Sequence, residues 1–124
     1  MRRSLYLILV LATLFATGCA TAQKGAMIRA YSSIKDSQYH AALSRLSEAE
    51  KLTPPTTALM AEIAFLRGQC YEGLRRLPEA IGSYRYLVAT FPESIYAYQA
   101  AERLKELTSP LPSMDTSLNP AQVQ

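Results

Sequence analysis

The stretch from Leu66 to Pro92 constrains the fold more than any other part of the chain. Its apolar and small residues recur at helical spacings, which is typical of helices that each have one apolar face. These positions are Leu66, Cys70, Leu74, Leu77, Ala80, Ile81, Tyr84, Leu87, Val88 and Phe91. The pattern predicts two short helices that face each other across a tight turn. Pro78 fits the first turn of the second helix because its missing N–H has no partner there in any case, and Pro92 ends that helix.

Two small residues, Gly68 and Ala80, are expected where these helices cross. A glycine inside a helix costs about 1 kcal/mol relative to alanine, so we expect Gly68 to let the backbone of the partner helix approach closely. The spacing of Gly68, Tyr71, Ala80, Tyr84 and Pro92 resembles the tetratricopeptide repeat. The resemblance implies paired helices, with the aromatic side chains filling the seam between them.

An earlier part of the chain repeats this pattern at an offset of 38 residues. Ala42 corresponds to Ala80, and Pro54 corresponds to Pro92 (80 − 42 and 92 − 54). Repeats of the resembled family have about 34 residues, so we expect the extra residues around 54–58, as a longer loop or an extra helical turn. The fold predicted for residues 26–107 is all-α: a tetratricopeptide-like α-solenoid of two helical hairpins and a C-terminal capping helix. Besides the helix that Pro92 ends, the expected helices span 26–34, 39–52, 57–74 and 95–107.

Residues 1–18 are typical of a secretory signal peptide. Arg2 and Arg3 supply positive charge, and an apolar run of eleven residues follows at 5–15. That run is too short to span a bilayer, which takes roughly 20 residues. Removing two of the 13 basic residues leaves eleven Lys and Arg against ten Asp and Glu. The basic character therefore belongs mostly to the signal, and we predict no binding to nucleic acid.

The tetrapeptide Ala16-Thr17-Gly18-Cys19 resembles the end of a bacterial lipobox, in which the cysteine thiol takes a diacylglyceryl group. The resemblance implies a mature chain that begins at Cys19 and is held in a membrane by acyl chains, at about 0.8 kcal/mol per buried CH₂. Ala20 follows where an aspartate would signal retention in the inner membrane, which favours a periplasm-facing position on the outer membrane. The alternative is an ordinary secretory signal in which Cys19 is incidental.

Two further segments are expected outside the helical domain. Residues 19–25 are predicted to form a lipidated tether between membrane and domain. Residues 108–124 contain three prolines and no apolar periodicity, which predicts a disordered tail or, alternatively, a short docking peptide.

The sequence contains no pattern that is typical of an active site. His40 is its single histidine, and we find no metal-ligand spacing, no glycine-rich phosphate loop and no nucleophile elbow. Cys70 lies on an apolar face and is expected to be a small buried hydrophobic residue. The alternative is a free reactive thiol or an intermolecular bridge. We therefore predict no enzyme activity, no metal, no small-molecule substrate and no cofactor other than the covalent lipid on Cys19.

The resemblance to tetratricopeptide repeats implies a groove, lined by the first helix of each hairpin, that takes a peptide or a helix of a partner. The residues expected to line it are Met27, Tyr31, Ile34, Glu62, Phe65, Gln69 and Glu72. Their mixture of apolar, aromatic and acidic side chains suits a protein ligand with apolar anchors. The alternative is that Met27, Ile34 and Phe65 are simply part of the core.

The chain is similar to helical-repeat lipoproteins that serve outer-membrane protein assembly, Tol–Pal coordination or secretins. This similarity implies a membrane-anchored periplasmic scaffold or adaptor that binds another envelope protein or peptide. The alternative is an accessory subunit that positions an envelope enzyme, such as one acting on peptidoglycan.

Overall fold

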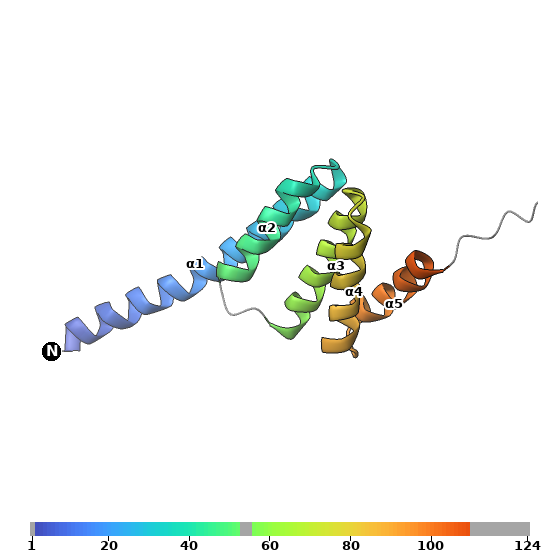
Figure 1. Ribbon diagram of the computed structural model, residues 1–124. Helices are drawn as coiled ribbons and strands as arrows, with labels where there is room; N and C mark the ends of the chain where they lie inside the picture. Colours follow the sequence, from blue (N-terminus) through green and yellow to red (C-terminus); the bar gives the residue numbers. More distant parts are fainter. Residues whose placement is uncertain (1, 53–55, 110–124) are drawn as a thin grey trace, which may run out of the picture.

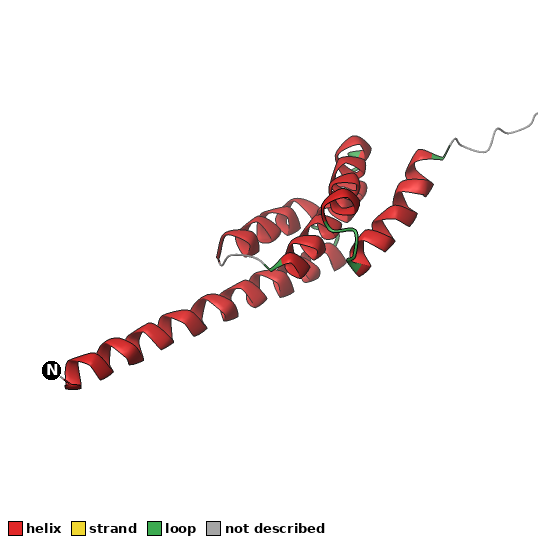
Figure 2. Ribbon diagram, turned by 90° about the horizontal axis from the view of Figure 1, so that it is seen from below, coloured by secondary structure: helices red, strands yellow, loops and turns green. Residues whose placement is uncertain are grey.

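The computed structural model describes residues 2–52 and 56–109, and within the first helix it describes the side chains of residues 6–10 and from 21 onward. These residues form five helices and no strand, so the all-helical fold class is confirmed (Figure 1). The helices are α1 (Arg2–Lys35), α2 (Tyr39–Leu52), α3 (Thr57–Gly73), α4 (Leu77–Thr90) and α5 (Ile95–Thr108). Figure 2 shows that the described connections between them are short. The tail predicted at 108–124 lies outside the described residues from residue 110 onward.

The first helix is longer than the sequence predicted. No proline interrupts residues 2–35, and α1 is continuous over them, so the segment 19–25, expected as a tether, is helical. Its N-terminal part extends away from the other helices (Figure 1). The Gln23 side-chain amide donates a hydrogen bond to the Ala49 carbonyl oxygen at 3.0 Å, so α1 contacts α2 before residue 26. No helix in the described part of the chain combines the length and apolar character needed to cross a membrane.

The turns that close the two hairpins have the same hydrogen bonds. Ser37 and Arg75 adopt left-handed backbone conformations, with φ of 57° and 60°. The Ser37 N–H donates to the Ile34 carbonyl, and the Arg75 N–H donates to the Glu72 carbonyl. In each turn the next N–H donates to the carbonyl of the residue five positions earlier. This pair of bonds satisfies carbonyls that a helix end would otherwise leave free.

The starts of α3 and α5 also match. The Thr56 hydroxyl accepts a hydrogen bond from the Leu59 N–H, and the Ser94 hydroxyl accepts one from the Tyr96 N–H, each at 3.2 Å. These two capping residues are 38 positions apart, as are Ser37 and Arg75 in the turns (94 − 56 and 75 − 37). The repeat expected from the sequence is therefore present in the backbone of the hairpins and in the start of α5.

The interiors of α2 and α4 follow the same register. Three positions on each helix are completely buried: Ala42, Leu46 and Ala49 on α2, and Ala80, Tyr84 and Leu87 on α4. Each residue of the second set lies 38 positions after its counterpart. The offset that was predicted from the apolar pattern therefore also relates the buried positions of the second helix in each hairpin.

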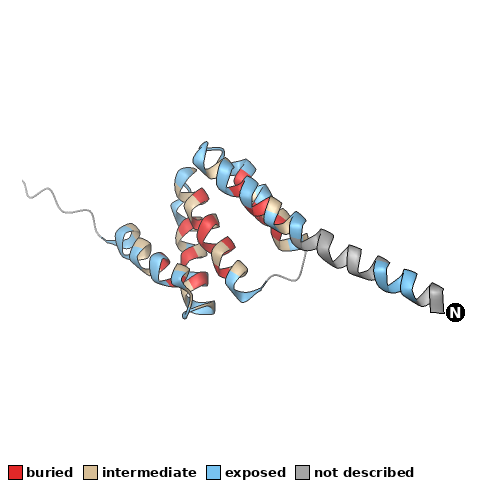
Figure 3. Cartoon of the chain, turned by 180° about the vertical axis from the view of Figure 1, so that it is seen from behind, coloured by how far each residue is buried: buried red, intermediate tan, exposed pale blue. Residues whose placement is uncertain are grey.

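Helix α3 contributes to two buried clusters. One of its faces packs with α1 and α2 in a cluster of Ala26, Met27, Ala30, Ala42, Leu46, Ala49, Ile63, Leu66 and Cys70. Another face packs with α4 and α5 in a cluster of Ala61, Ala64, Phe65, Ala80, Tyr84, Leu87, Ala97 and Ala100. Figure 3 shows these buried residues gathered where the helices face one another. Because it is apolar on both faces, α3 joins the first hairpin to the rest of the fold.

The packing at Gly68 corrects one expectation. A Cβ atom placed at Gly68 would lie 2.3 Å from Cε1 of Tyr84, so the close neighbour is a side chain on α4 rather than a partner backbone at Ala80. The reason is the size of the phenol ring, which is completely buried and fills the space that a smaller residue would leave to the backbone. Gly73 similarly makes room for the ring of Tyr39, since a Cβ there would lie 2.3 Å from its Cζ.

Candidate functional site

A hollow of about 480 Å³ lies between α1 and α3. It is lined by Gln23, Lys24, Met27, Ile28, Tyr31, Thr56, Leu59 and Glu62. We call it the α1–α3 hollow. Three of the residues predicted to line a groove, Met27, Tyr31 and Glu62, therefore meet at one place. Ile28 and Tyr31 are 69% and 44% exposed, so the apolar part of this hollow is open to solvent.

A hydrogen bond from the Tyr31 hydroxyl to the Glu62 carboxylate joins the two sides of the α1–α3 hollow. Partial burial raises the pKa of Tyr31, and the nearby carboxylate of Glu62 raises it further. Tyr96, on α5, has a smaller effect in the same direction. Tyr31 therefore remains a protonated donor at neutral pH, and it holds Glu62 at the edge of the hollow.

Two of the other predicted groove residues are part of the core. Phe65 is 8% exposed, and the centre of its ring lies 5.8 Å from that of Tyr84 and 5.7 Å from that of Tyr96. Ile34 is half-buried and packs against the cluster formed by α1, α2 and α3. Met27 belongs to that same cluster while also lining the hollow. Phe65 and Ile34 are therefore core residues, as the alternative interpretation of the sequence expected.

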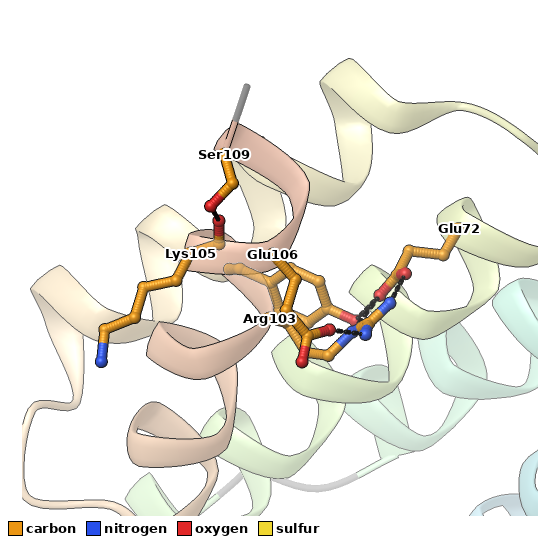
Figure 4. A network of polar contacts seen from close by, with 6 residues as sticks. Glu72, Arg103, Lys105, Glu106 and Ser109 are labelled. Carbon is orange, nitrogen blue, oxygen red and sulfur yellow. Dashed lines mark hydrogen bonds and ion pairs between the residues drawn. The ribbon is translucent and has the colours of Figure 1, made fainter. Parts of the chain in front are cut away.

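Glu72, which was also predicted to line the groove, holds α3, α4 and α5 together. Its Oε1 accepts hydrogen bonds from the Tyr84 hydroxyl at 2.6 Å and from Nε of Arg103 at 3.2 Å. A second guanidinium nitrogen of Arg103 pairs with the other carboxylate oxygen, and a third pairs with Glu106 (Figure 4). Burial alone would raise the pKa of Glu72, but the hydrogen bonds from Arg103 and Tyr84 outweigh it and the pKa is lowered. Glu72 is therefore already neutralised within the fold.

The sequence did not predict this pairing of Glu72 with Arg103. Charge pairs within a helix can be anticipated from spacings of three or four residues. Arg103 lies 31 positions after Glu72, on another helix, and the packing of α5 decides the contact. Of the groove candidates this leaves Gln69, which is half-buried on α3.

A second hollow of about 450 Å³ lies around the loop before α5. Its lining residues are Thr57, Ala58, Thr90, Phe91, Pro92, Glu93, Ser94, Ile95 and Tyr96. We call it the α3–α5 hollow. Thr57 and Ala58 line it, while Thr56 and Leu59 line the α1–α3 hollow. The first turn of α3 therefore separates two openings that the apolar pattern alone did not reveal.

A third hollow of about 410 Å³ is lined by residues of α2, α3 and α4, including Glu50, Arg67, Tyr71, Glu79 and Tyr86. Both of its carboxylates already have cationic partners. Glu50 pairs with Arg67 at 2.6 Å, and Glu79 pairs with Arg76 at 2.6 Å. The guanidinium of Arg76 also lies 5.2 Å from the centre of the Tyr71 ring. This hollow is therefore electrostatically complete without a ligand.

The remaining residues singled out from the sequence have no arrangement for catalysis in the described part of the chain. No group of three or more His, Cys, Asp and Glu residues in that part could hold a metal ion. His40 is exposed at the start of α2. Cys70 is completely buried, and burial raises the pKa of its thiol to about 11, so the nucleophilic thiolate is disfavoured. Cys19 lies within α1, but its side chain is outside the described set. Pro92 is exposed and follows Phe91, the C-cap residue of α4.

No protein-family model matches this chain. No curated protein matches it. No solved structure matches it either.

Proposed function

We propose that this chain is a lipid-anchored adaptor of the bacterial cell envelope that binds a segment of another envelope protein. The observation that carries the proposal is the α1–α3 hollow, where the exposed Ile28, the half-buried Leu59 and the buried Met27 form an apolar wall beside Tyr31 and Glu62. Openings of this size, mostly apolar with a few placed polar groups, are where proteins commonly bind ligands. An aromatic residue beside aliphatic ones is also a common arrangement in protein-binding surfaces.

The repeated hairpin supports a tetratricopeptide-like stack as the scaffold. The same 38-residue offset relates the closing turns, the caps of α3 and α5, and the buried positions of α2 and α4. Proteins of stacked helical pairs use extended surfaces for partner binding. Both open hollows are lined by residues of α3, which would be the first helix of the second hairpin in such a stack.

The lipid anchor is the second part of the proposal. The pattern ending at Cys19 supports acylation of that cysteine, and Ala20 supports a final position on the outer membrane, facing the periplasm. Replacing Cys19 by alanine (Cys19→Ala) in cells is expected to move the protein from the membrane pellet into the soluble envelope fraction. Retention in the pellet would contradict the anchor without affecting the binding surface.

Binding at the hollow can be tested by placing a photo-crosslinking amino acid in the full chain in cells. We expect a partner to be crosslinked from position 28 in α1, where Ile28 is 69% exposed and lines the α1–α3 hollow. The matched control is position 98 in α5, because Tyr98 is 72% exposed and lines neither open hollow. The replacement Tyr31→Ala is expected to reduce the crosslink from position 28. Equal crosslinking from both positions would contradict the proposed site.

A further inference from the structure

We infer that the segment bound by this chain is amphipathic, with two apolar anchors and cationic side chains beside them, and that it crosses the first turn of α3. This inference rests on the proposed function and specifies the chemistry of the partner.

The two anchors follow from the positions of the open hollows. The α1–α3 hollow has an apolar wall of Met27, Ile28 and Leu59. The α3–α5 hollow has another, formed by Phe91, Ile95 and Tyr96. Ile95 is 69% exposed, so this second wall is open to solvent as the first is. Since only the first turn of α3 separates the hollows, one short segment can place an apolar side chain in each.

The cationic character follows from the carboxylates at the two hollows. Glu62 lines the first and Glu93 lines the second, and in the described part of the chain neither forms an ion pair. Glu62 accepts a hydrogen bond from Tyr31 at one oxygen, and this neutral donor does not cancel its charge. Lys24 lines the same hollow as Glu62 and, among the described residues, is the single cationic residue that lines either hollow. The two openings together therefore present an excess of negative charge.

The third hollow, lined by α2, α3 and α4, differs from these two because its carboxylates are already paired. Its carboxylates, Glu50 and Glu79, are each paired with an arginine of the same chain. A partner bearing lysine or arginine would gain less by approaching them, because a cation already lies beside each. At Glu62 and Glu93 it would gain attraction that steers the encounter and selects the partner, while the apolar anchors supply most of the affinity.

The test measures binding of short synthetic peptides to the full chain held in phosphatidylcholine nanodiscs, with binding to empty nanodiscs subtracted. Three fluorescent peptides of equal length are compared by anisotropy. The first is built from leucine and lysine, the second from leucine and glutamate, and the third from serine and lysine. We expect the leucine–lysine peptide to bind about tenfold more tightly than either of the others, because it alone has both the anchors and the charge. Equal or tighter binding of the leucine–glutamate peptide would overturn the inference.

Substitutions then locate the binding of the leucine–lysine peptide. Glu62→Gln keeps an acceptor for Tyr31 and removes the charge. Glu93→Gln removes the charge from an exposed residue of the loop before α5, where the change does not threaten the fold. Each is expected to weaken binding about fivefold. Asp36→Asn is the matched control, since it changes the net charge equally on an exposed residue that lines neither hollow and, in the described part of the chain, also forms no ion pair. Equal weakening by Asp36→Asn would show an unspecific charge effect and would reject the inference.

The peptide experiment and the crosslinking experiment fail separately. A partner crosslinked at position 28, together with no preference among the three peptides, would leave the adaptor function standing and reject the partner chemistry. A clear preference for the leucine–lysine peptide that Glu62→Gln and Glu93→Gln both weaken would support the inference.

Discussion

The two hairpins share one backbone plan but are packed with different chemistry. At three equivalent steps, each 38 residues apart, the first hairpin has apolar residues and the second has a glycine, a tyrosine and a glutamate. The pairs are Ala30 and Gly68, Leu46 and Tyr84, and Ile34 and Glu72. In the first hairpin all three side chains belong to, or pack against, one apolar cluster. In the second, the larger ring of Tyr84 requires a residue without a Cβ beside it, and its buried hydroxyl finds an acceptor in Glu72.

This difference shows how a buried polar group can be introduced into a helical repeat. A buried hydroxyl without a partner is costly, so the tyrosine is tolerated because the acceptor is present on the neighbouring helix. The remaining charge of Glu72 is compensated by Arg103 on α5. The residue 38 positions before Arg103 is Phe65, so the first hairpin has no equivalent cation at that step. The second hairpin therefore gains a polar link to the helix that follows it.

Among the substitutions that test this difference between the hairpins, Gly68→Ala is expected to change the free energy of unfolding most. The new Cβ of Gly68→Ala would lie 2.3 Å from the Tyr84 ring, which is completely buried and held at its hydroxyl, so it cannot swing aside. We expect the free energy of unfolding to fall by about 2–3 kcal/mol, measured by urea unfolding followed by circular dichroism. The double replacement Gly68→Ala with Tyr84→Leu recreates the Ala30 and Leu46 pair and is expected to recover part of that loss. Strictly additive effects would show that the two positions are not coupled.

Removing only the hydroxyl tests the polar half of the difference. Tyr84→Phe keeps the ring but leaves Glu72 without one of its buried hydrogen-bond donors. Hydrogen bonds to charged groups are worth more than neutral ones, and we expect a loss of about 1–2 kcal/mol in the same unfolding measurement. The control is Tyr86→Phe on the same helix, because Tyr86 is 48% exposed. A similar loss in both variants would mean that the link through Glu72 contributes no specific stability.

Acid should weaken the second hairpin through the same carboxylate. The folded state lowers the pKa of Glu72 from its ordinary value of 4.5, so the folded protein binds this proton less readily than the unfolded chain does. Its contribution is therefore fully present above pH 4.5 and is lost as the pH falls through the lowered folded-state pKa. We expect the stability advantage of the natural chain over Glu72→Gln to shrink across that range. An advantage that is independent of pH would contradict the assigned role of the charge.

The smallest effect is expected at Gly82, and it has the opposite sign. A Cβ there would meet no atom within 4 Å, unlike the one at Gly68, and the equivalent step of the first hairpin is Ser44. Gly82→Ala should therefore raise the free energy of unfolding by about 0.5–1 kcal/mol, because alanine is the better helix former. Gly68→Ala is the matched comparison, because the same substitution is expected to lower the free energy of unfolding there. Destabilisation at Gly82 would show that the space beside it is needed.

Local sequence signals predicted much of the helical framework. The bounds of α2 and the start of α5 coincide with those expected, and α5 begins after the capping residue Ser94. These features depend on neighbours within a few positions, so periodicity and capping rules can find them. The continuation of α1 through residues 19–25 was not predicted, because a pattern that resembles a cleavage site carries no information on backbone conformation before processing.

The candidate site was predicted less completely. Met27 and Tyr31 lie four positions apart on α1 and Glu62 lies on α3; the register of the resembled repeat assigned all three to the groove, and they meet at one hollow. Phe65 was assigned to the same surface, but its ring is covered by Tyr84 and Tyr96. Periodicity identifies which side of a helix is apolar, but it cannot tell which part of that side a neighbouring helix will cover. The α3–α5 hollow escaped prediction for the same reason, since a loop and parts of three helices build it together.

The matching caps at Thr56 and Ser94 have a practical consequence for engineering. Because both residues cap a helix at the same position of the repeat, the segment 57–94 begins and ends at equivalent helix starts. If a duplicate of this segment were inserted after Ser94, each of its ends would form a connection that the chain already contains. The molecule thus contains its own modular unit, by which a longer version could be assembled without inventing a new connection.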